Sequence, residues 1–341
     1  TDRVEVELAA IVKALAVDRV FVLVDENTAE CCLSRVDLSE CDPFVIKIKA
    51  GDESKTIDAA VGIWDELVDN GATRSSLLVN LGGGMVTDLG GFVAATFKRG
   101  MKFVNVPTTL LGVVDAATGG KTGVNFRGLK NEIGVFAKAE RVLVDTRFFE
   151  TLDFKNRLSG YAEMVKHALI ADPILLEQTL NYDLDAFDMA RLATLLKQNI
   201  QIKENIVAVD LNETGLRKAL NFGHTVGHAF ESLSYELNSP MLHGFAVMWG
   251  MVAELYLSVI RLGFPREILA QTSHLMLEYY GRPQCNCKER ERLLEWMMKD
   301  KKNRVAGEIN FSLLKTIGDG MVDQIVSHEE LEEALEYLFS L

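Results

Sequence analysis

Short runs of β-branched and apolar residues alternate with helical patterns over the first 150 residues, and this alternation most constrains the fold. The pattern predicts strands at 20–24, 44–48, 77–81, 102–106 and 141–145, and a helix at 55–70. Three of the strands end directly at a turn signal, namely Asp25, Gly82 and Pro107. Strands that alternate with helices form a largely parallel sheet with helices on its faces.

The pattern changes near residue 150. Beyond it, helical patterns dominate at 158–171, 189–209, 224–236, 244–261 and 287–300, and a short strand pair is predicted near 308–314 and 324–326. We therefore expect two domains, 1–150 and 151–341, since domains commonly hold about 100–200 residues. The predicted fold class is an α/β N-terminal domain with a mostly parallel, Rossmann-like sheet, followed by an α-helical C-terminal domain.

Charge and cysteine content restrict the partners and the compartment. The chain has 49 acidic and 36 basic residues and a net charge of −13, which disfavours nucleic acid and acidic membranes as partners. Its five cysteines lack the spacing of a disulfide framework or a C-x-x-C metal site. No apolar run reaches the roughly 18 residues of a membrane span, and the first residues do not resemble a signal peptide. These features predict a cytoplasmic protein with reduced thiols.

A glycine loop follows the third predicted strand. Gly82, Gly83 and Gly84 lead from the strand into a predicted helix, where backbone N–H groups can approach a phosphate closely. The spacing differs from G-x-G-x-x-G, so a tight structural turn is an equal interpretation. Asp25 and Asn27, after the first strand, suit hydrogen bonds to a nucleotide ribose, although a simple turn explains them as well.

Histidines and one acidic residue suggest a metal site in the second domain. His224 and His228 stand at i and i+4 on a predicted helix, and His243 opens the next helix. Glu163 lies in an otherwise apolar helical stretch, where a charge needs a partner or a metal. Core histidines and a salt-bridged glutamate remain the simpler alternative. The absence of H-E-x-x-H disfavours a zincin protease.

Cations and amides gather in a few segments of this acidic chain. Lys121 and Lys130 lie in a glycine-rich stretch that we expect to be a phosphate-cradling loop, together with two asparagines. Lys203, Arg217 and Asn221 precede the histidine helix. The combination is typical of an anion site beside a metal site, although each segment alone also fits a solvated surface.

Five motif stretches resemble the 3-dehydroquinate synthases, a family of sugar-phosphate cyclases. They cover 82–100 (GGGMVTDLGGFVAATFKRG), 106–131, 161–166 (YAEMVK), 210–231 and 242–244, and the resemblance extends over nearly the whole chain. It implies NAD bound between an α/β and a helical domain, a divalent ion (Zn²⁺ or Co²⁺), a phosphorylated sugar acid as substrate, and a homodimer.

The resemblance also implies roles for individual residues. The expected NAD residues are Asp25, Asn27, Asp52, Lys55, Gly83, Gly84, Asp88, Thr108, Thr109, Lys121, Lys130, Phe148, Thr151 and Leu152. The expected metal ligands are Glu163, His224 and His243. The expected substrate and catalytic residues are Asp115, Lys121, Lys130, Asn131, Lys166, Lys203, Glu213, Arg217, Asn221 and His228, with Arg99 reaching the neighbouring subunit and Lys301, or in another register Lys302, holding phosphate.

Two positions depart from the family pattern. Asp52 replaces a glutamate, which is a conservative change, and Phe245 replaces a glutamate after His-Gly, which leaves His243 itself intact. In the implied reaction, NAD oxidises a substrate hydroxyl carbon, phosphate is eliminated, the hydride returns, and ring opening with an intramolecular aldol step closes the carbocycle.

Three other functions are compared with that of a 3-dehydroquinate synthase. Another sugar-phosphate cyclase, such as a 2-deoxy-scyllo-inosose or valiolone synthase, has a substrate without a carboxylate and no need for Lys203 and Arg217 together. A metal-dependent alcohol dehydrogenase of related fold releases NADH. A non-catalytic binding protein does not need the complete set of matched residues.

Overall fold

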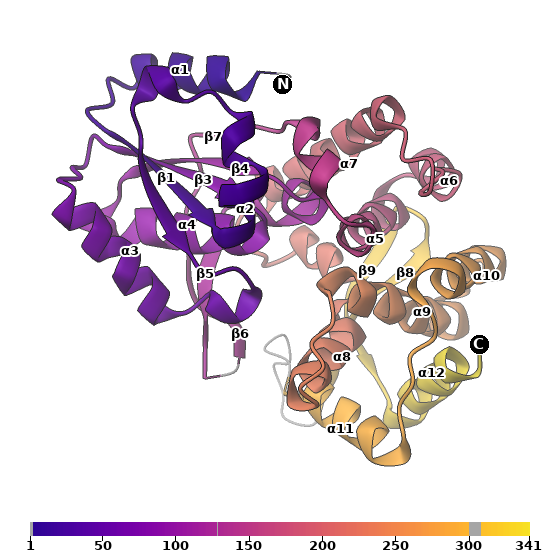
Figure 1. Cartoon of the computed structure of the whole chain (residues 1–341). Helices are drawn as coiled ribbons and strands as arrows, with labels where there is room; N and C mark the ends of the chain where they lie inside the picture. The colour runs from indigo at the N-terminus through magenta and orange to yellow at the C-terminus, as the bar shows by residue number, and fades with distance from the viewer. Residues whose placement is uncertain (1–2, 128, 300–307) are drawn as a thin grey trace. The chain divides into compact units, whose positions relative to one another are not determined.

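The computed structural model describes residues 3–127, 129–299 and 308–341, which divide into two compact units, 1–153 and 154–341 (Figure 1). The helices and strands of the first unit are α1 (Val4–Ala14), β1 (Val20–Asp25), α2 (Glu26–Cys31), β2 (Phe44–Ile48), α3 (Ile57–Asp69), β3 (Leu77–Gly82), α4 (Gly84–Thr96), β4 (Lys102–Pro107), β5 (Lys121–Phe126), β6 (Leu129–Phe136) and β7 (Arg141–Val142). Short helical turns η4 (Phe97–Arg99), η5 (Gly112–Ala116) and η6 (Thr146–Thr151) link them.

The first unit is built on a parallel sheet with strand order β2-β1-β3-β4-β7, which confirms the predicted α/β fold. Strands β1 and β3 are buried along their whole length. Phe21 and Leu23 of β1 pack in one core cluster with residues of α3 and α4, and Val20, Val22 and Val24 pack in another with residues of α1. Helices on both faces explain why these strands are buried and mostly apolar.

Parallel strands bring their carboxyl ends to one edge of the sheet. The chain leaves β1 toward β2 on one side and then returns to place β3 on the other side of β1. The carboxyl ends of β1 and β3, at Asp25 and Gly82, therefore flank the point at which strand order reverses. In open α/β sheets, this switch point is where ligands bind.

The region 119–131 corrects the sequence prediction. Residues 121–126 and 129–136 form the antiparallel hairpin strands β5 and β6, whereas a glycine-rich loop was expected. Gly123 pairs with Gly134, and a Cβ on Gly134 would lie 2.3 Å from the carbonyl oxygen of Thr122. The glycines therefore allow two strands to approach closely. In the sequence, glycines with this role cannot be told from glycines of a loop. The predicted fifth strand is also shorter, since β7 ends at Val142.

The second unit is mainly helical. Its elements are α5 (Phe154–Ala171), α6 (Pro173–Leu180), α7 (Met189–Val209), η7 (Leu216–Asn221), α8 (His224–Glu236), α9 (His243–Leu262), α10 (Arg266–Leu275), η8 (Met276–Tyr280), α11 (Cys287–Met298), β8 (Ile309–Thr316), β9 (Asp319–Val326) and α12 (His328–Ser340). Strands β8 and β9 form the antiparallel pair that the sequence predicts. Among described helices, α9 alone is long and apolar enough to span a membrane, but it packs against α5, α8, α12 and β8 as a core helix.

Two glycines let α9 approach its neighbours. A Cβ on Gly244 would lie 2.0 Å from the carbonyl oxygen of Ser159 in α5. A Cβ on Gly250 would lie 2.0 Å from the carbonyl oxygen of Gly223 and 2.7 Å from the amide nitrogen of Gly227. These obstacles are backbone atoms that cannot rotate away, so both contacts require glycine.

We expect Gly250→Ala to lower the free energy of unfolding by about 1–3 kcal/mol or more, because α8 and α9 must separate to admit the methyl group. The measurement is urea-induced unfolding followed by circular dichroism. Gly62→Ala is the matched control, because a Cβ there meets nothing within 4 Å and Gly62 lies inside helix α3. It should raise stability by about 0.5–1 kcal/mol. Equal stability of the two variants would contradict the close-contact explanation.

Candidate active site

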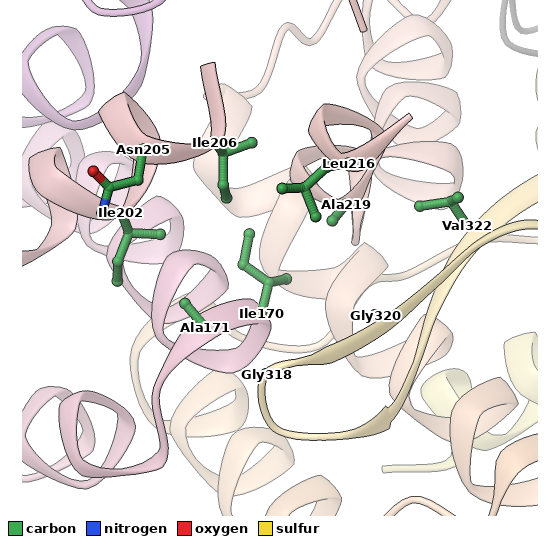
Figure 2. Close-up of a pocket in the computed structure, with 10 residues that line it drawn as sticks. All are labelled: Ile170, Ala171, Ile202, Asn205, Ile206, Leu216, Ala219, Gly318, Gly320 and Val322. Atoms are coloured by element: carbon green, nitrogen blue, oxygen red, sulfur yellow. The ribbon is translucent and has the colours of Figure 1, made fainter. Parts of the chain in front are cut away.

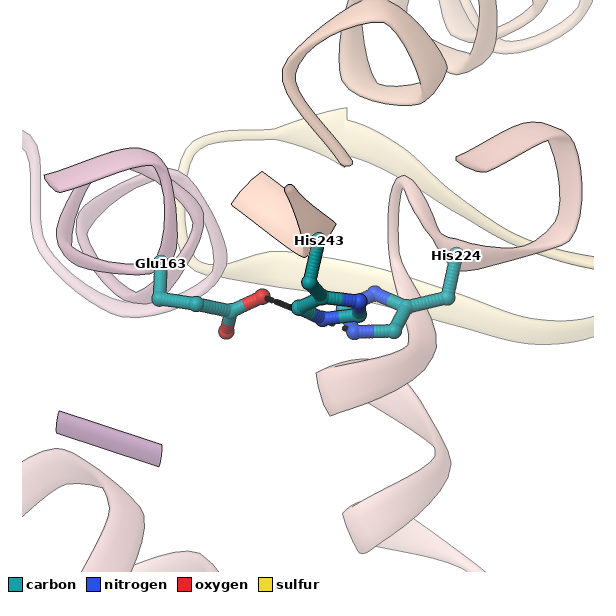
Figure 3. Close-up of side chains that lie close together, drawn as sticks. All are labelled: Glu163, His224 and His243. Carbon is teal, nitrogen blue, oxygen red and sulfur yellow. Dashed lines mark ion pairs between the residues drawn. The ribbon is translucent and has the colours of Figure 1, made fainter. Parts of the chain in front are cut away.

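Three side chains from three helices converge inside the second unit (Figure 3). Glu163 lies in the middle of α5, and His224 and His243 are the first residues of α8 and α9. The Oε1 atom of Glu163 lies 3.5 Å from Nε2 of His224 and 3.6 Å from Nε2 of His243. One ligand atom from each residue lies within 4.8 Å of the others. One carboxylate and two imidazoles form the donor set of many catalytic zinc sites, so the residues fit such an ion.

The Nδ1 atoms of both imidazoles, which are the nitrogens not facing Glu163, each have a hydrogen-bond acceptor. His224 Nδ1 lies 3.0 Å from the carbonyl oxygen of Phe222, and His243 Nδ1 lies 3.3 Å from Oε2 of Glu231. Acceptors at Nδ1 place the proton there and leave Nε2 as a lone-pair donor, which is the arrangement around metal-binding histidines. The sequence analysis did not single out Glu231. Its signal was an acidic residue directly after Phe230, inside the predicted helix.

A second trio, formed by His228, Glu231 and His243, is also close enough to hold an ion. It shares His243 with the first trio, and its Glu231 contacts that imidazole at Nδ1. We therefore favour the set in which Nε2 of His243 faces the buried carboxylate of Glu163.

The charges around this cluster act in opposite directions on the two histidines. Lys166, one turn from Glu163 on α5 and also buried, forms an ion pair with that carboxylate. Burial and the nearby ammonium of Lys166 lower the pKa of His224 well below its usual value. Burial opposes the charge on His243, but the Glu231 and Glu163 carboxylates outweigh it and raise the pKa of His243 to about 10. The two carboxylates thus favour positive charge at His243, whereas Lys166 opposes positive charge at His224.

Most of the other expected second-unit residues lie on elements that pack against one another. Helix α5 contacts α7, η7 and α9, and α7 contacts η7. Lys203 on α7 and Arg217 in η7 are both buried, and Arg217 Nη1 donates to the carbonyl oxygen of Leu211 at 2.6 Å. Asn221 donates to Glu213 at 2.5 Å. The ring of His228 lies 5.2 Å from that of His224, centroid to centroid.

Six of the expected nucleotide residues of the first unit, Asp25, Asn27, Gly83, Gly84, Thr108 and Thr109, lie at or beside the carboxyl edge of the sheet. Gly83 caps α4, and a Cβ there would lie 3.0 Å from Cγ2 of Thr109. Thr108 donates its amide to the carbonyl oxygen of Gly82. Asp25 caps α2 by accepting the amide of Thr28. The loops after β1, β3 and β4 therefore carry these residues at or beside the topological switch point, with Asn27 and Gly84 in the first turns of α2 and α4.

Lys55 is the centre of a polar cluster in the first unit. Its buried ammonium lies 3.1 Å from Asp88, 3.6 Å from Asp52 and 2.5 Å from Oδ1 of Asn131. Burial opposes this charge, but the carboxylates of Asp88 and Asp52 raise the pKa of Lys55 overall. Lys130 lies 3.2 Å from Asp52.

Asn125 joins this cluster to the hairpin. Its side chain donates to the backbone carbonyl and to the carboxylate of Asp52, and it accepts the amide of Asn131. Hairpin β5–β6 and the turn before α3 are thereby held together. The aspartate that stands where the family has glutamate still reaches Lys55 and Lys130.

The remaining expected site residues lie on other elements of the chain. Phe148 packs its ring in the hydrophobic core, and Thr151 and Leu152 follow it at the end of η6. Lys121 is exposed at the start of β5, and Asp115 lies in η5. Arg99 is exposed and has a left-handed backbone, with φ +66°. Lys301 and Lys302 lie outside the described residues.

An apolar hollow in the second unit contains none of the expected site residues (Figure 2). It lies between the ends of α5 and α7, η7 and the β8–β9 turn, and aliphatic side chains such as Ile170, Ile202 and Ile206 line it. The hollow lacks the charged groups that a phosphorylated ligand needs, so we do not assign it to the chemistry.

Comparison with known proteins agrees with these features. Residues 45–159 match the N-terminal model of 3-dehydroquinate synthase, and residues 160–303 match its C-terminal model. A 3-dehydroquinate synthase from Parabacteroides distasonis is 47% identical over 97% of this chain and 94% of its own length.

Two solved structures share the fold. A 2-deoxy-scyllo-inosose synthase complexed with carbaglucose-6-phosphate, NAD⁺ and Co²⁺ has a TM-score of 0.83 and 20% identity, covering 98% of this chain and 95% of its own. A 2-epi-5-epi-valiolone synthase from Streptomyces hygroscopicus with NAD⁺ and Zn²⁺ has a TM-score of 0.80 and 26% identity, covering 97% and 93%. The two family models together span more than half of the chain, and the convergent carboxylate and imidazoles lie within them. The chain belongs to the 3-dehydroquinate synthase family.

Proposed function

We propose that this enzyme, a 3-dehydroquinate synthase of the shikimate pathway, converts 3-deoxy-D-arabino-heptulosonate 7-phosphate into 3-dehydroquinate and phosphate, with bound NAD and a divalent ion as cofactors. The observation that carries the proposal is the buried Glu163 carboxylate facing two imidazoles whose Nδ1 atoms each have a hydrogen-bond acceptor. The structures of related cyclases with NAD⁺ and Zn²⁺ or Co²⁺ support the same cofactors here.

Glu163, His224 and His243 would hold the ion. When bound, a divalent ion supplies Lewis acidity to substrate hydroxyls. Glu231 and the carbonyl of Phe222 fix the two imidazoles for this task. The neighbouring rings of His228 and His224 support a role for His228 in moving a proton at the substrate.

The first unit would hold NAD, which supplies reversible hydride transfer. The N-terminus of α4, with Gly83 and Gly84, offers backbone N–H groups and a favourable dipole to a pyrophosphate. The Lys55 cluster would orient the nicotinamide half through its network with Asp52, Asp88 and Asn131. Because the ring of Phe148 is in the core, we expect η6 to contact NAD through backbone groups.

The second unit supplies the cations that distinguish this substrate. Lys203 and Arg217 are both buried, on elements that pack together, and a buried cation needs an anionic or hydrogen-bonding partner. A planar guanidinium binds a carboxylate through two parallel hydrogen bonds, and an ammonium adds a compact charge. This pair favours a carboxylated substrate over those of the inosose and valiolone synthases, and it has no role in a simple alcohol dehydrogenase.

For the subunit arrangement and the compartment, we propose a cytoplasmic homodimer. Arg99 is exposed on a strained, left-handed turn between α4 and β4. Strained backbone conformations of this kind cluster at active sites and ligand-binding positions. We propose that Arg99 completes the phosphate site of the partner subunit.

The proposed function predicts phosphate release without net formation of NADH. In Arg217→Ala, kcat/KM should fall by one to two powers of ten, because a buried charge-assisted hydrogen bond contributes about 1.5–3 kcal/mol and 1.4 kcal/mol is tenfold. The loss should be much smaller for a substrate analogue that lacks the carboxylate and keeps the phosphate. The measurement combines a phosphate assay, NADH absorbance and identification of the product.

Lys218→Ala is the control for this experiment. It removes the next cation of the same turn, whose ammonium lies 2.6 Å from Asp323, and kcat/KM should change little. Equal losses on both substrates in Arg217→Ala would show that the arginine serves the phosphate or the fold. One NADH per turnover would indicate a dehydrogenase, and absence of both products would indicate a binding protein.

A shared site predicts complementation between inactive subunits. Arg99→Ala and His228→Ala homodimers should each be inactive, and a mixed dimer should regain part of the activity because one of its sites keeps both residues. The measurement is activity after co-expression and purification with two different tags. Lys98→Ala, which changes the neighbouring exposed cation, should remain active. A purified mixed dimer without activity would rule out the shared site.

A further inference from the structure

A buried carboxylate of α9 holds the start of α8. Glu254 is fully buried, and its two oxygens accept the backbone amides of Gly223 at 2.6 Å, Thr225 at 3.0 Å and Val226 at 3.2 Å. Helix N-termini leave amides without intrahelical partners. The residue before α8 is Gly223, which has no side chain to cap them, so a carboxylate from another helix provides the cap.

The amides capped by Glu254 flank one of the candidate metal ligands in the sequence. Gly223 and Thr225 stand on either side of His224, and both donate to Glu254. Glu254 itself lies on the helix that begins with His243. The same contact region includes Gly250, whose missing Cβ allows the backbone of Gly223 to touch α9. One carboxylate thus ties the backbone of His224 to the helix that carries His243.

We propose that Glu254 is a positioning residue for the metal centre. By fixing the first turn of α8, it keeps Nε2 of His224 directed at Glu163 and at Nε2 of His243. The inference rests on the metal centre of the proposed function. Glu254 accepts backbone amides at the start of α8 and therefore acts through the placement of His224.

The geometry indicates how Glu254→Gln should act. Glutamine keeps the size of the side chain but offers one acceptor oxygen, and its amide donors face the amides of α8. The first turn loses part of its cap, and His224 is less firmly held. Supports behind metal ligands typically change metal affinity by about 10–100-fold when they are mutated. We expect a rise of this size in the Kd for Co²⁺.

The test uses the full-length protein, freed of metal by a chelator and then titrated with Co²⁺. The Kd comes from competition with a chromogenic chelator, and the visible absorption of bound Co²⁺ reports its ligand geometry. In Glu254→Gln, we expect the weaker Kd together with an altered spectrum. Leu331→Ala is the control, because it removes a buried side chain of α12 and leaves a cavity beside that helix. It should lower stability but leave the Kd for Co²⁺ and the absorption spectrum unchanged.

The outcomes separate this inference from the proposed function. A Glu254→Gln protein with the wild-type Kd and spectrum would overturn the positioning role and leave the metal centre standing. A wild-type protein that binds no Co²⁺ would overturn the metal centre and, with it, the role of Glu254. If the glutamine variant does not fold, Glu254→Asp provides the test, because it keeps the charge but withdraws it by one methylene; an unchanged Kd there would also overturn the inference.

Discussion

The buried carboxylate of Glu163 imposes the arrangement of the second unit. A fully buried charge is costly unless partners compensate it, and here Lys166 forms an ion pair with the carboxylate and two imidazoles lie 3.5 and 3.6 Å from it. The imidazoles belong to the first residues of two helices, so α8 and α9 must both begin beside the middle of α5. Gly244 and Gly250 allow that approach, because a side chain at either position would meet backbone. Packing and chemistry therefore depend on the same close contacts.

In the first unit, the parallel sheet determines where the polar residues lie. Loops that carry Asp25, Gly83 and Thr109 all leave the sheet at its carboxyl edge, since the strands run in one direction. The hairpin β5–β6 then brings Asn125 and Asn131 to Lys55 and Asp52. The shared direction of the strands accounts for the first set of polar groups and the hairpin for the second, while helices cover the apolar faces of the sheet.

Sequence patterns predicted the elements whose burial is regular. Strands β1 to β4 and helices α7 to α9 follow from apolar periodicity, and the i, i+4 spacing of His224 and His228 marked the region of the candidate metal site. The choice of His224 and His243 as ligands came from family resemblance, since spacing alone left core histidines open. The hairpin was missed because its paired glycines resemble a loop. Glu231 and Glu254 were missed because their partners are far along the chain or are backbone amides, which no local pattern records.

The most direct test of this account is anomalous diffraction at the zinc absorption edge from crystals of active, zinc-loaded enzyme. The account predicts one strong peak about 2.0–2.2 Å from a carboxylate oxygen of Glu163 and from Nε2 of both His224 and His243. A peak bound instead by His228 and Glu231, or catalytically active crystals without a peak in this unit, would contradict it.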